Sequence, residues 1–156
     1  MSSWESRVTE LGLTLYGPHL PHDPLDAVVV YAGTARTSGQ LPRIEGQLTC
    51  VGTLGIDVTV EAGADAALVC ALNALSVLRL HLGTLDRIKR VLTVTGYVAS
   101  APEFHDQPAV VDGASAVLFE IFGDAGRHTR SAIGVAALPR GGAVEIELTV
   151  ALEDGL

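Results

Sequence analysis

An arginine and a glutamate near the end of the chain are the residues whose types and spacing could do chemistry. Arg130 and Glu145 belong to two successive segments, residues 128–139 and 144–150, in which apolar side chains recur with a period of two. A Pro-Arg-Gly-Gly turn separates the segments, so the pattern is typical of two strands joined by a turn. The residues predicted to face the core are Ile133, Val135, Val144, Ile146, Leu148 and Val150. If the strands pair through the turn, Arg130 and Glu145 share the opposite face, where they could clamp a carboxylate ligand and activate a water molecule beside it.

The elements that must position this pair form an alternating series. The predicted elements before the two Arg/Glu strands are strands at residues 28–31, 34–37 and 88–100 and helices at residues 60–82 and 107–122. Each helix has one apolar face and is followed by a glycine that can end it, Gly83 or Gly123. The order predicts an α+β fold in which both helices pack on one face of a single sheet.

The face of the sheet away from the helices is predicted to be mixed in polarity. Its predicted members are Thr93, Thr95, Tyr97, Arg130, Glu145 and Glu147. Within the strand 88–100, simple alternation places Leu92 and Val94 on one face and Val91 on the other. A mixed face cannot be the core of a monomer, so we expect a second copy of the sheet to cover it, with sites between subunits.

Composition limits the class of protein. With 156 residues, of which 48% are hydrophobic and 18% charged, the chain predicts one well-packed domain. The net charge of −8 disfavours a nucleic-acid surface, which needs Lys and Arg to neutralise phosphates. The N-terminus is too polar for a signal peptide, and we expect no apolar run near the roughly 20 residues that cross a bilayer. Cys50 and Cys70 lack a ligand or disulfide spacing and predict free thiols, so we expect a soluble, cytoplasmic protein without a membrane partner.

Several short motifs extend from about Asp26 to Ala151. They are Ser38-Gly39-Gln40-Leu41-Pro42, the helix containing Asn73, Val98-Ala99-Ser100-Ala101-Pro102-Glu103-Phe104, Gly113-Ala114-Ser115, Phe122-Gly123, and the run from Arg130-Ser131-Ala132 through Leu138-Pro139 to Val144-Glu145-Ile146-Glu147. In residue types and spacing together, the chain resembles the YjgF/RidA family of reactive-intermediate deaminases, in its longer subgroup formerly labelled endoribonuclease L-PSP or translation initiation inhibitor. The resemblance implies a chorismate-mutase-like fold and a homotrimer whose sheets form a central barrel, with sites in the clefts between subunits. Residues 1–156 would form a single domain, with residues 1–25 as an N-terminal extension.

The resemblance also implies an activity. Family members of the deaminase kind hydrolyse enamine and imine products of pyridoxal-phosphate enzymes, such as 2-aminoacrylate, to the 2-keto acid and ammonia, without a cofactor or metal. Carried over by motif, Arg130 would bind the substrate carboxylate bidentately and Glu145 would position or deprotonate the attacking water. The turn formed by Ser38 and Gly39 would hold the imine end through backbone groups, since glycine permits a close approach.

Three positions depart from the family pattern and bear on specificity. Leu25 stands near the place of a cleft tyrosine in many relatives, and Ala132 stands where many have a cysteine. Asp112 stands where an asparagine is frequent. A further carboxylate beside a carboxylate-binding site would weaken the binding of anionic ligands and could shift the substrate preference.

Other interpretations remain open from the residues alone. Arg130 could be a structural ion-pair partner of Glu145 or Glu147, because ion-pair networks imitate sites. The scaffold could bind a small carboxylate metabolite or a partner protein without turnover, or act as an endoribonuclease, although no basic groove is apparent. His19, His22 and Asp23 have a spacing that could bind a metal, but a third firm ligand is lacking and we expect no metal site there.

Overall fold

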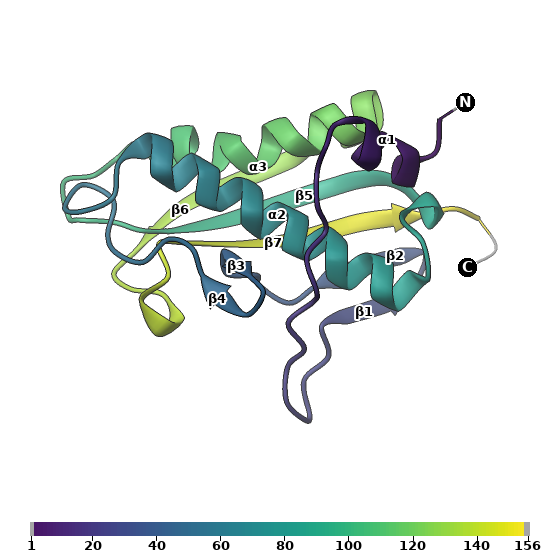
Figure 1. The fold of residues 1–156 in the computed structure, drawn as a ribbon, viewed down its shortest axis with the longest axis horizontal. Coiled ribbons are helices and arrows are strands. Elements are labelled where there is room, and N and C mark those ends of the chain that lie inside the picture. Colours follow the sequence, from purple (N-terminus) through teal and green to yellow (C-terminus); the bar gives the residue numbers. More distant parts are fainter. Residues whose placement is uncertain (1, 155–156) are drawn as a thin grey trace.

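A computed structural model describes residues 2–154 of the chain and contains one five-stranded sheet with helices on one side (Figure 1). The strands of this sheet are β1 (Val28–Tyr31), β2 (Thr34–Thr37), β5 (Ile88–Ala99), β6 (Thr129–Val135) and β7 (Val144–Leu152). Their order is β1-β2-β7-β5-β6, and all neighbours are antiparallel except β5 and β6, which are parallel. A separate two-stranded hairpin is formed by β3 (Arg43–Ile44) and β4 (Gln47–Leu48).

Two long helices cover one face of the sheet, as the periodicity predicts. They are α2 (Val60–Leu82) and α3 (Gln107–Phe122), with the bounds expected from the sequence. Gly83 ends α2 in the left-handed conformation, with φ of 88°. Residues 2–154 also contain three short 3-10 helices: Leu85–Arg87, Gly123–Gly126 and Pro139–Gly141. The predicted α+β class with both helices on one face is therefore confirmed.

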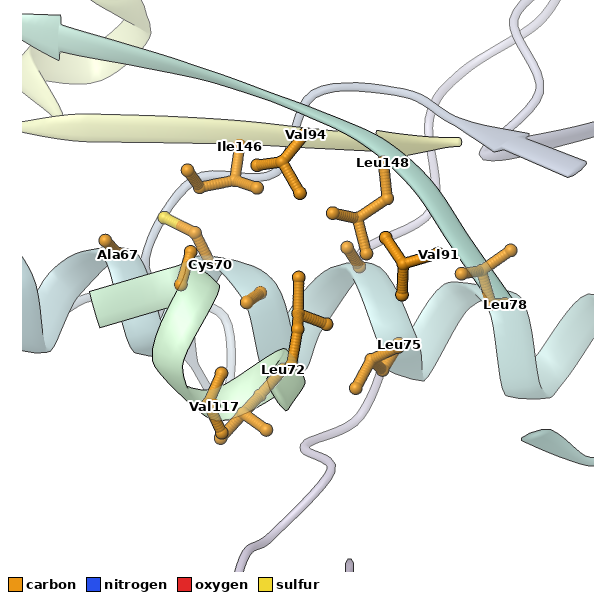
Figure 2. Packing of buried hydrophobic residues seen from close by; sticks show 14 of the residues in the cluster. Ala67, Cys70, Leu72, Leu75, Leu78, Val91, Val94, Val117, Ile146 and Leu148 are labelled. Carbon is orange, nitrogen blue, oxygen red and sulfur yellow. The ribbon is translucent and has the colours of Figure 1, made fainter. Parts of the chain in front are cut away.

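The core lies between α2, α3 and the two central strands, β5 and β7. Figure 2 shows Val94, Ile146 and Leu148 of the sheet directed toward α2, where the Cys70 side chain points toward Ile146. The predicted inward residues of β7, which are Val144, Ile146, Leu148 and Val150, are all fully buried. The helix α2 is long and apolar enough to cross a membrane, contrary to our expectation for any segment of this chain, but 67% of its apolar window is buried inside the fold. Its hydrophobicity is explained by its place in the core.

The N-terminal extension is ordered against the rest of the fold. Its first part forms a short helix, α1 (Trp4–Glu10), which the sequence analysis does not predict. The Trp4 ring packs edge-on against Phe122 with 5.1 Å between ring centroids, and its Nε1 donates a hydrogen bond to the Ile88 carbonyl at 2.9 Å. The following irregular segment reaches α2, where the Ser76 hydroxyl donates to the Tyr16 carbonyl. Both cysteines are free, with Cys70 buried in the core and Cys50 half-buried.

The two Arg/Glu strands do not form the hairpin that the turn suggests. Instead, β5 lies between β6 and β7 in the sheet. The helix α3 connects β5 to β6 as a crossover, and such a connection makes the two strands parallel. The register aligns Arg130 with Val94 of β5, and Val94 with Leu148 of β7. Since laterally paired residues point to the same face, Arg130 faces the helices and Glu145 faces away from them. The expectation that both lie on the non-core face is therefore wrong.

The alternation in β6 misleads because small residues, rather than large apolar ones, face the helices. A Cβ atom at Gly134 would lie 2.7 Å from Nε2 of Gln107, so α3 begins too close to this strand for a large side chain. Ile133 instead aligns with Tyr97 on the open face, which is the side of the sheet away from α2 and α3, and is 43% exposed. The open face therefore contains Ile133, which the sequence pattern predicts to face the core, and does not contain Arg130.

A β-bulge changes the faces in the first half of β5. The register with β7 shifts between Val91 and Thr93, which inserts one extra residue into β5. As a result Val91 and Val94 both point into the core, whereas Leu92 is exposed. The predicted grouping of Leu92 with Val94 is corrected by this bulge. From Thr93 onward, Thr93, Thr95 and Tyr97 lie on the open face as expected.

The two helices cross with backbone in contact, which requires glycine at the crossing. A Cβ atom at Gly113 of α3 would lie 2.0 Å from the carbonyl oxygen of Ala64 in α2. A backbone oxygen cannot move aside as a side chain can, so the helices would have to separate. Gly96 of β5 allows a similar close approach between the sheet and α3, since a Cβ atom there would lie 2.6 Å from a methyl carbon of Val111.

We therefore expect Gly113→Ala to destabilise the fold, although alanine is the better helix former. Overpacking of this kind costs about 1–3 kcal/mol, which circular dichroism should detect as a lower Tm. Gly17→Ala is the matched control, because a Cβ atom at Gly17 meets nothing within 4 Å and should leave the Tm near that of the wild type. A Gly113→Ala protein as stable as the control would contradict the close crossing.

Candidate functional site

Arg130 lies at the helix-facing rim of the sheet and contacts two side chains of α3. Its Nη1 donates a hydrogen bond to Oδ1 of Asp112 at 2.7 Å and a second one to Oγ of Ser115 at 3.2 Å. The arginine side chain is only 22% exposed, whereas Asp112 is 68% exposed. Among residues 2–154 neither Nε nor Nη2 has a protein partner, so the side-on edge of the guanidinium can still bind a planar anion. The predicted residues Arg130 and Asp112 are thus brought together as an ion pair.

His128 extends this group on the side of Ser115. Its Nε2 lies 3.0 Å from Oγ of Ser115, and its Nδ1 lies 2.6 Å from the carbonyl oxygen of Gly126. Ala132 lies two residues beyond Arg130 on the same side of β6 and packs against the core. A cysteine at this position would therefore face the helix layer beside Arg130.

Glu145 forms the second half of the candidate site, next to the turn that follows β2. A Cβ atom at Gly39 would lie 2.7 Å from both Cδ and Oε2 of Glu145, so the carboxylate rests directly against the glycine backbone. Gln40 and Ile146 exchange both backbone hydrogen bonds, at 2.8 and 3.0 Å, which fixes the turn to β7. Ser38 anchors the other end of the turn, since its hydroxyl donates to the Asp26 carbonyl at 2.7 Å. The predicted residues Ser38, Gly39 and Glu145 are therefore brought together.

The environment of Glu145 makes it a stronger base than an ordinary glutamate. Burial raises the pKa of its carboxyl group, and the negative charge of Glu147 raises it further. Arg43 opposes this shift and holds the pKa back. A carboxylate that is partly desolvated and whose pKa is raised accepts a proton more readily near neutral pH.

Glu147 has partners of its own on the open face. It accepts a hydrogen bond from the Tyr97 hydroxyl at 3.2 Å and lies 3.6 Å from Nη2 of Arg36. Burial and the neighbouring Glu147 carboxylate raise the pKa of Tyr97. The ion pair with Glu147 that the sequence offers as a structural role for Arg130 is made by Arg36 instead.

The two halves of the candidate site, the group around Arg130 and the group around Glu145, lie apart within one chain. Arg130, Asp112 and Ala132 lie on the helix-facing side at the β6 edge, and Ser38, Gly39 and Glu145 lie beyond β5 with Glu145 on the open face. One half can bind an anionic group and the other can activate water. A reaction that needs both would use Arg130 of one copy and Glu145 of another.

The other sequence candidates lie outside both halves. Leu25 is 55% exposed and lines a hollow of about 470 Å³ between the N-terminal segment and α2. Within residues 2–154, no group of three or more His, Cys, Asp or Glu side chains could hold a metal ion, and this includes the surroundings of His19, His22 and Asp23.

Sequence reasoning missed Ser115 and His128 as partners of Arg130. Ser115 follows Asp112 by three residues, which places both on one side of α3, and His128 precedes Arg130 by two, which is the repeat of a strand face. The signal was therefore present, but only the position of β6 beside α3 shows that the two patterns meet.

Replacing Glu145 should reveal the cost of its partly buried charge. Because its folded-state pKa is raised, the favourable effect of protonation on stability is complete below the ordinary value of 4.5 and is lost as the pH rises through the folded-state pKa. We expect Glu145→Gln to have a higher Tm than the wild type at pH 7, and the difference to disappear near pH 4. Thermal unfolding across this range measures it, with the exposed Glu103→Gln as the control. A difference that grows toward low pH would contradict the assignment.

A family model, a known protein and solved structures are similar to this chain along nearly its whole length. Residues 5–149 match the family model described as "YjgF/chorismate mutase-like, putative endoribonuclease". Protein TCP17 of Trypanosoma cruzi is 38% identical over 150 residues, which cover 96% of this chain and 94% of that protein. The crystal structure of Atu1372 from Agrobacterium tumefaciens, of unknown function, is 38% identical with a TM-score of 0.88 and coverages of 96% and 93%. A "putative endoribonuclease" from Shewanella oneidensis is 33% identical with a TM-score of 0.92 and coverages of 96% and 99%. The α+β architecture described above is thus chorismate-mutase-like, and the chain belongs to the YjgF/RidA family.

Proposed function

We propose that this protein hydrolyses reactive enamines and imines of the 2-aminoacrylate type to 2-keto acids and ammonia, at sites formed between the subunits of a homotrimer. The observation that carries the proposal is the Glu145 carboxylate, held against Gly39 on the face of the sheet opposite to α2 and α3, with a raised pKa. A base in this position needs only an electrophile with a fixed orientation. Arg130 of a neighbouring subunit supplies that orientation.

The reaction balances with water as the only co-reactant. The enamine takes up a proton from solvent at its methylene carbon to give the protonated imine. The imine carbon then bonds to the oxygen of water as Glu145 accepts a proton of that water, which gives a carbinolamine. Glu145 returns this proton to the nitrogen, the C–N bond breaks and ammonia leaves, while the hydroxyl oxygen forms the keto group and its proton goes back to solvent.

Each half contributes one part of this reaction. The free Nε and Nη2 of Arg130 suit the substrate carboxylate, which would be held by two parallel hydrogen bonds. Because Gly39 has no side chain, the Glu145 carboxylate can lie directly against the backbone of the turn, where backbone groups would hold the imine end. A methyl group at Gly39 would displace the carboxylate.

Two features support a site between subunits. β6 is an edge strand, so a neighbouring chain can approach Arg130 from its open side. The open face combines charged residues with the exposed side chains of Val29, Tyr31 and Ile133. A mixed face of this kind is suited to burial between copies of the chain.

A second candidate is a carboxylate-binding protein without turnover. It is favoured by the Arg130–Asp112 contact of 2.7 Å, because Asp112 partly neutralises the guanidinium that should bind the substrate. In that case 2-oxobutanoate would raise the Tm although no imine is hydrolysed.

The deaminase proposal predicts faster ammonia release from 2-aminoacrylate generated in the assay by a pyridoxal-phosphate-dependent lyase. Arg130→Ala should lower kcat/KM by at least about 30-fold, because it removes a charge-assisted contact. Glu145→Gln should lower kcat by about 10²–10⁴-fold. A wild-type rate equal to that of buffer would exclude the enzyme and leave the binding protein.

Mixing the two impaired variants tests whether the site lies within one subunit or between two. If each site takes Arg130 from one subunit and Glu145 from its neighbour, random co-assembly of Arg130→Ala with Glu145→Gln restores about a quarter of the sites in a cyclic trimer. Co-expressed and separately purified proteins would be compared for ammonia release. A site within one chain would stay inactive in every mixture.

Asp112 should set the affinity for the substrate carboxylate. We expect Asp112→Asn to lower KM by up to about fivefold with little change in kcat, since an exposed ion pair of about 0.2–1 kcal/mol no longer competes for Arg130. The exposed Asp65→Asn on α2 is a matched control. An unchanged or higher KM for Asp112→Asn would show that the pair does not oppose the ligand.

A further inference from the structure

Arg130 is linked through Ser115 to a histidine whose other nitrogen is also bound. The distances are 3.2 Å from Nη1 of Arg130 to Oγ of Ser115, 3.0 Å from that oxygen to Nε2 of His128, and 2.6 Å from Nδ1 of His128 to the Gly126 carbonyl. The four groups come from β6, α3, the residue before β6 and the end of a 3-10 helix. This series of hydrogen bonds from Arg130 through Ser115 and His128 to Gly126, here called the relay, therefore connects elements that flank the β6 edge.

With a neutral His128 ring, the chemistry of the groups gives each hydrogen bond a single direction. A carbonyl oxygen can only accept, so Nδ1 of His128 carries the proton, and in the neutral ring Nε2 is then an acceptor. The Ser115 hydroxyl accordingly donates to Nε2. Its lone pairs are turned to accept from Arg130, which can only donate. The Ser115 hydroxyl thus donates one hydrogen bond and accepts one, and both ring nitrogens of His128 have a partner.

The relay determines which edge of the guanidinium is available. Nη1 has two protons, and Asp112 and Ser115 accept one each from it. The end-on edge, which needs a proton of Nη1, is therefore occupied. The side-on edge formed by Nε and Nη2 remains, and it matches the two oxygens of a carboxylate.

We infer that Ser115 and His128 are positioning residues that lock the Arg130 guanidinium, so that its Nε and Nη2 edge is presented to a monocarboxylate. The inference rests on the proposed function, in which Arg130 binds the substrate carboxylate. Ser115 acts directly on Arg130, and His128 acts through Ser115. Neither residue touches the ligand. Without the relay, Arg130 would keep its charge and its pair with Asp112 but could rotate about its side-chain bonds, which lowers the fraction of molecules ready to bind.

The test compares Ser115→Ala with Ser115→Thr by calorimetric titration of the full-length protein with 2-oxobutanoate. We expect about threefold to tenfold weaker binding for Ser115→Ala, from the loss of one hydrogen bond to a charged group, and near-normal binding for Ser115→Thr, which keeps the hydroxyl. His128→Leu should resemble Ser115→Ala, whereas His128→Gln, which retains an acceptor near the position of Nε2, should be milder. Ser6→Ala, the same change at an exposed position of α1 outside both halves of the site, is the control. In the hydrolysis assay Ser115→Ala should raise KM and leave kcat unchanged.

A second measurement does not depend on ligand or activity. In nitrogen-15 NMR spectra of arginine-labelled protein, restricted rotation about Cζ–Nε should give separate Nη1 and Nη2 signals for Arg130, and Ser115→Ala should merge them. If the wild type neither binds 2-oxobutanoate nor hydrolyses imines, the proposed function fails while the NMR comparison still tests the lock. If the wild type binds and Ser115→Ala matches Ser6→Ala in affinity and in spectrum, the relay is refuted and the proposed function stands.

Discussion

The crossover from β5 through α3 to β6 is the constraint on which the chemistry of this chain depends. It places β6 parallel to β5 at the edge of the sheet, where the even-spaced register aligns Arg130 with the buried Val94. Arg130 thereby faces α3, and Asp112 and Ser115 of that helix become its partners. Had the chain returned as a hairpin, the guanidinium would face the open side and none of these contacts would form. Topology, rather than residue type, assigns the arginine its surroundings.

Close backbone approach holds both halves of the candidate site in place. At the helix layer, Gly113 lets α3 contact the backbone of α2, and it lies between Asp112 and Ser115 in the sequence of α3. At the other end, Gly39 leaves room for the Glu145 carboxylate against the turn that Gln40 pins to β7. The two glycines have different effects. Gly113 allows tight packing of the helices, whereas Gly39 allows the Glu145 carboxylate to lie where its desolvation raises its pKa.

Much of the fold could be predicted from the sequence, because its periodic signals are strong. The bounds of α2 and α3, the inward residues of β7 and the glycine that ends α2 all follow from local patterns. The faces of β5 and β6 could not be predicted so well, for two physical reasons. A bulge at Val91 inserts a residue that alternation cannot detect, and β6 packs small residues inward because α3 lies close. The pairing of Ser38 and Gly39 with Glu145 follows the family motif, whereas the separation of Arg130 from Glu145 depends on strand order, which short motifs do not encode.

The separation of the two halves gives a reason for the mixed polarity of the open face. A monomer would leave Glu145, Glu147 and Arg36 on a surface that also exposes Ile133 and Tyr31, with the arginine directed to the other side. Association of copies through this face and the β6 edge would bury the apolar residues and bring Arg130 of one copy toward Glu145 of another. An isolated subunit would then have the base without the group that anchors the substrate, so the proposed activity would depend on assembly.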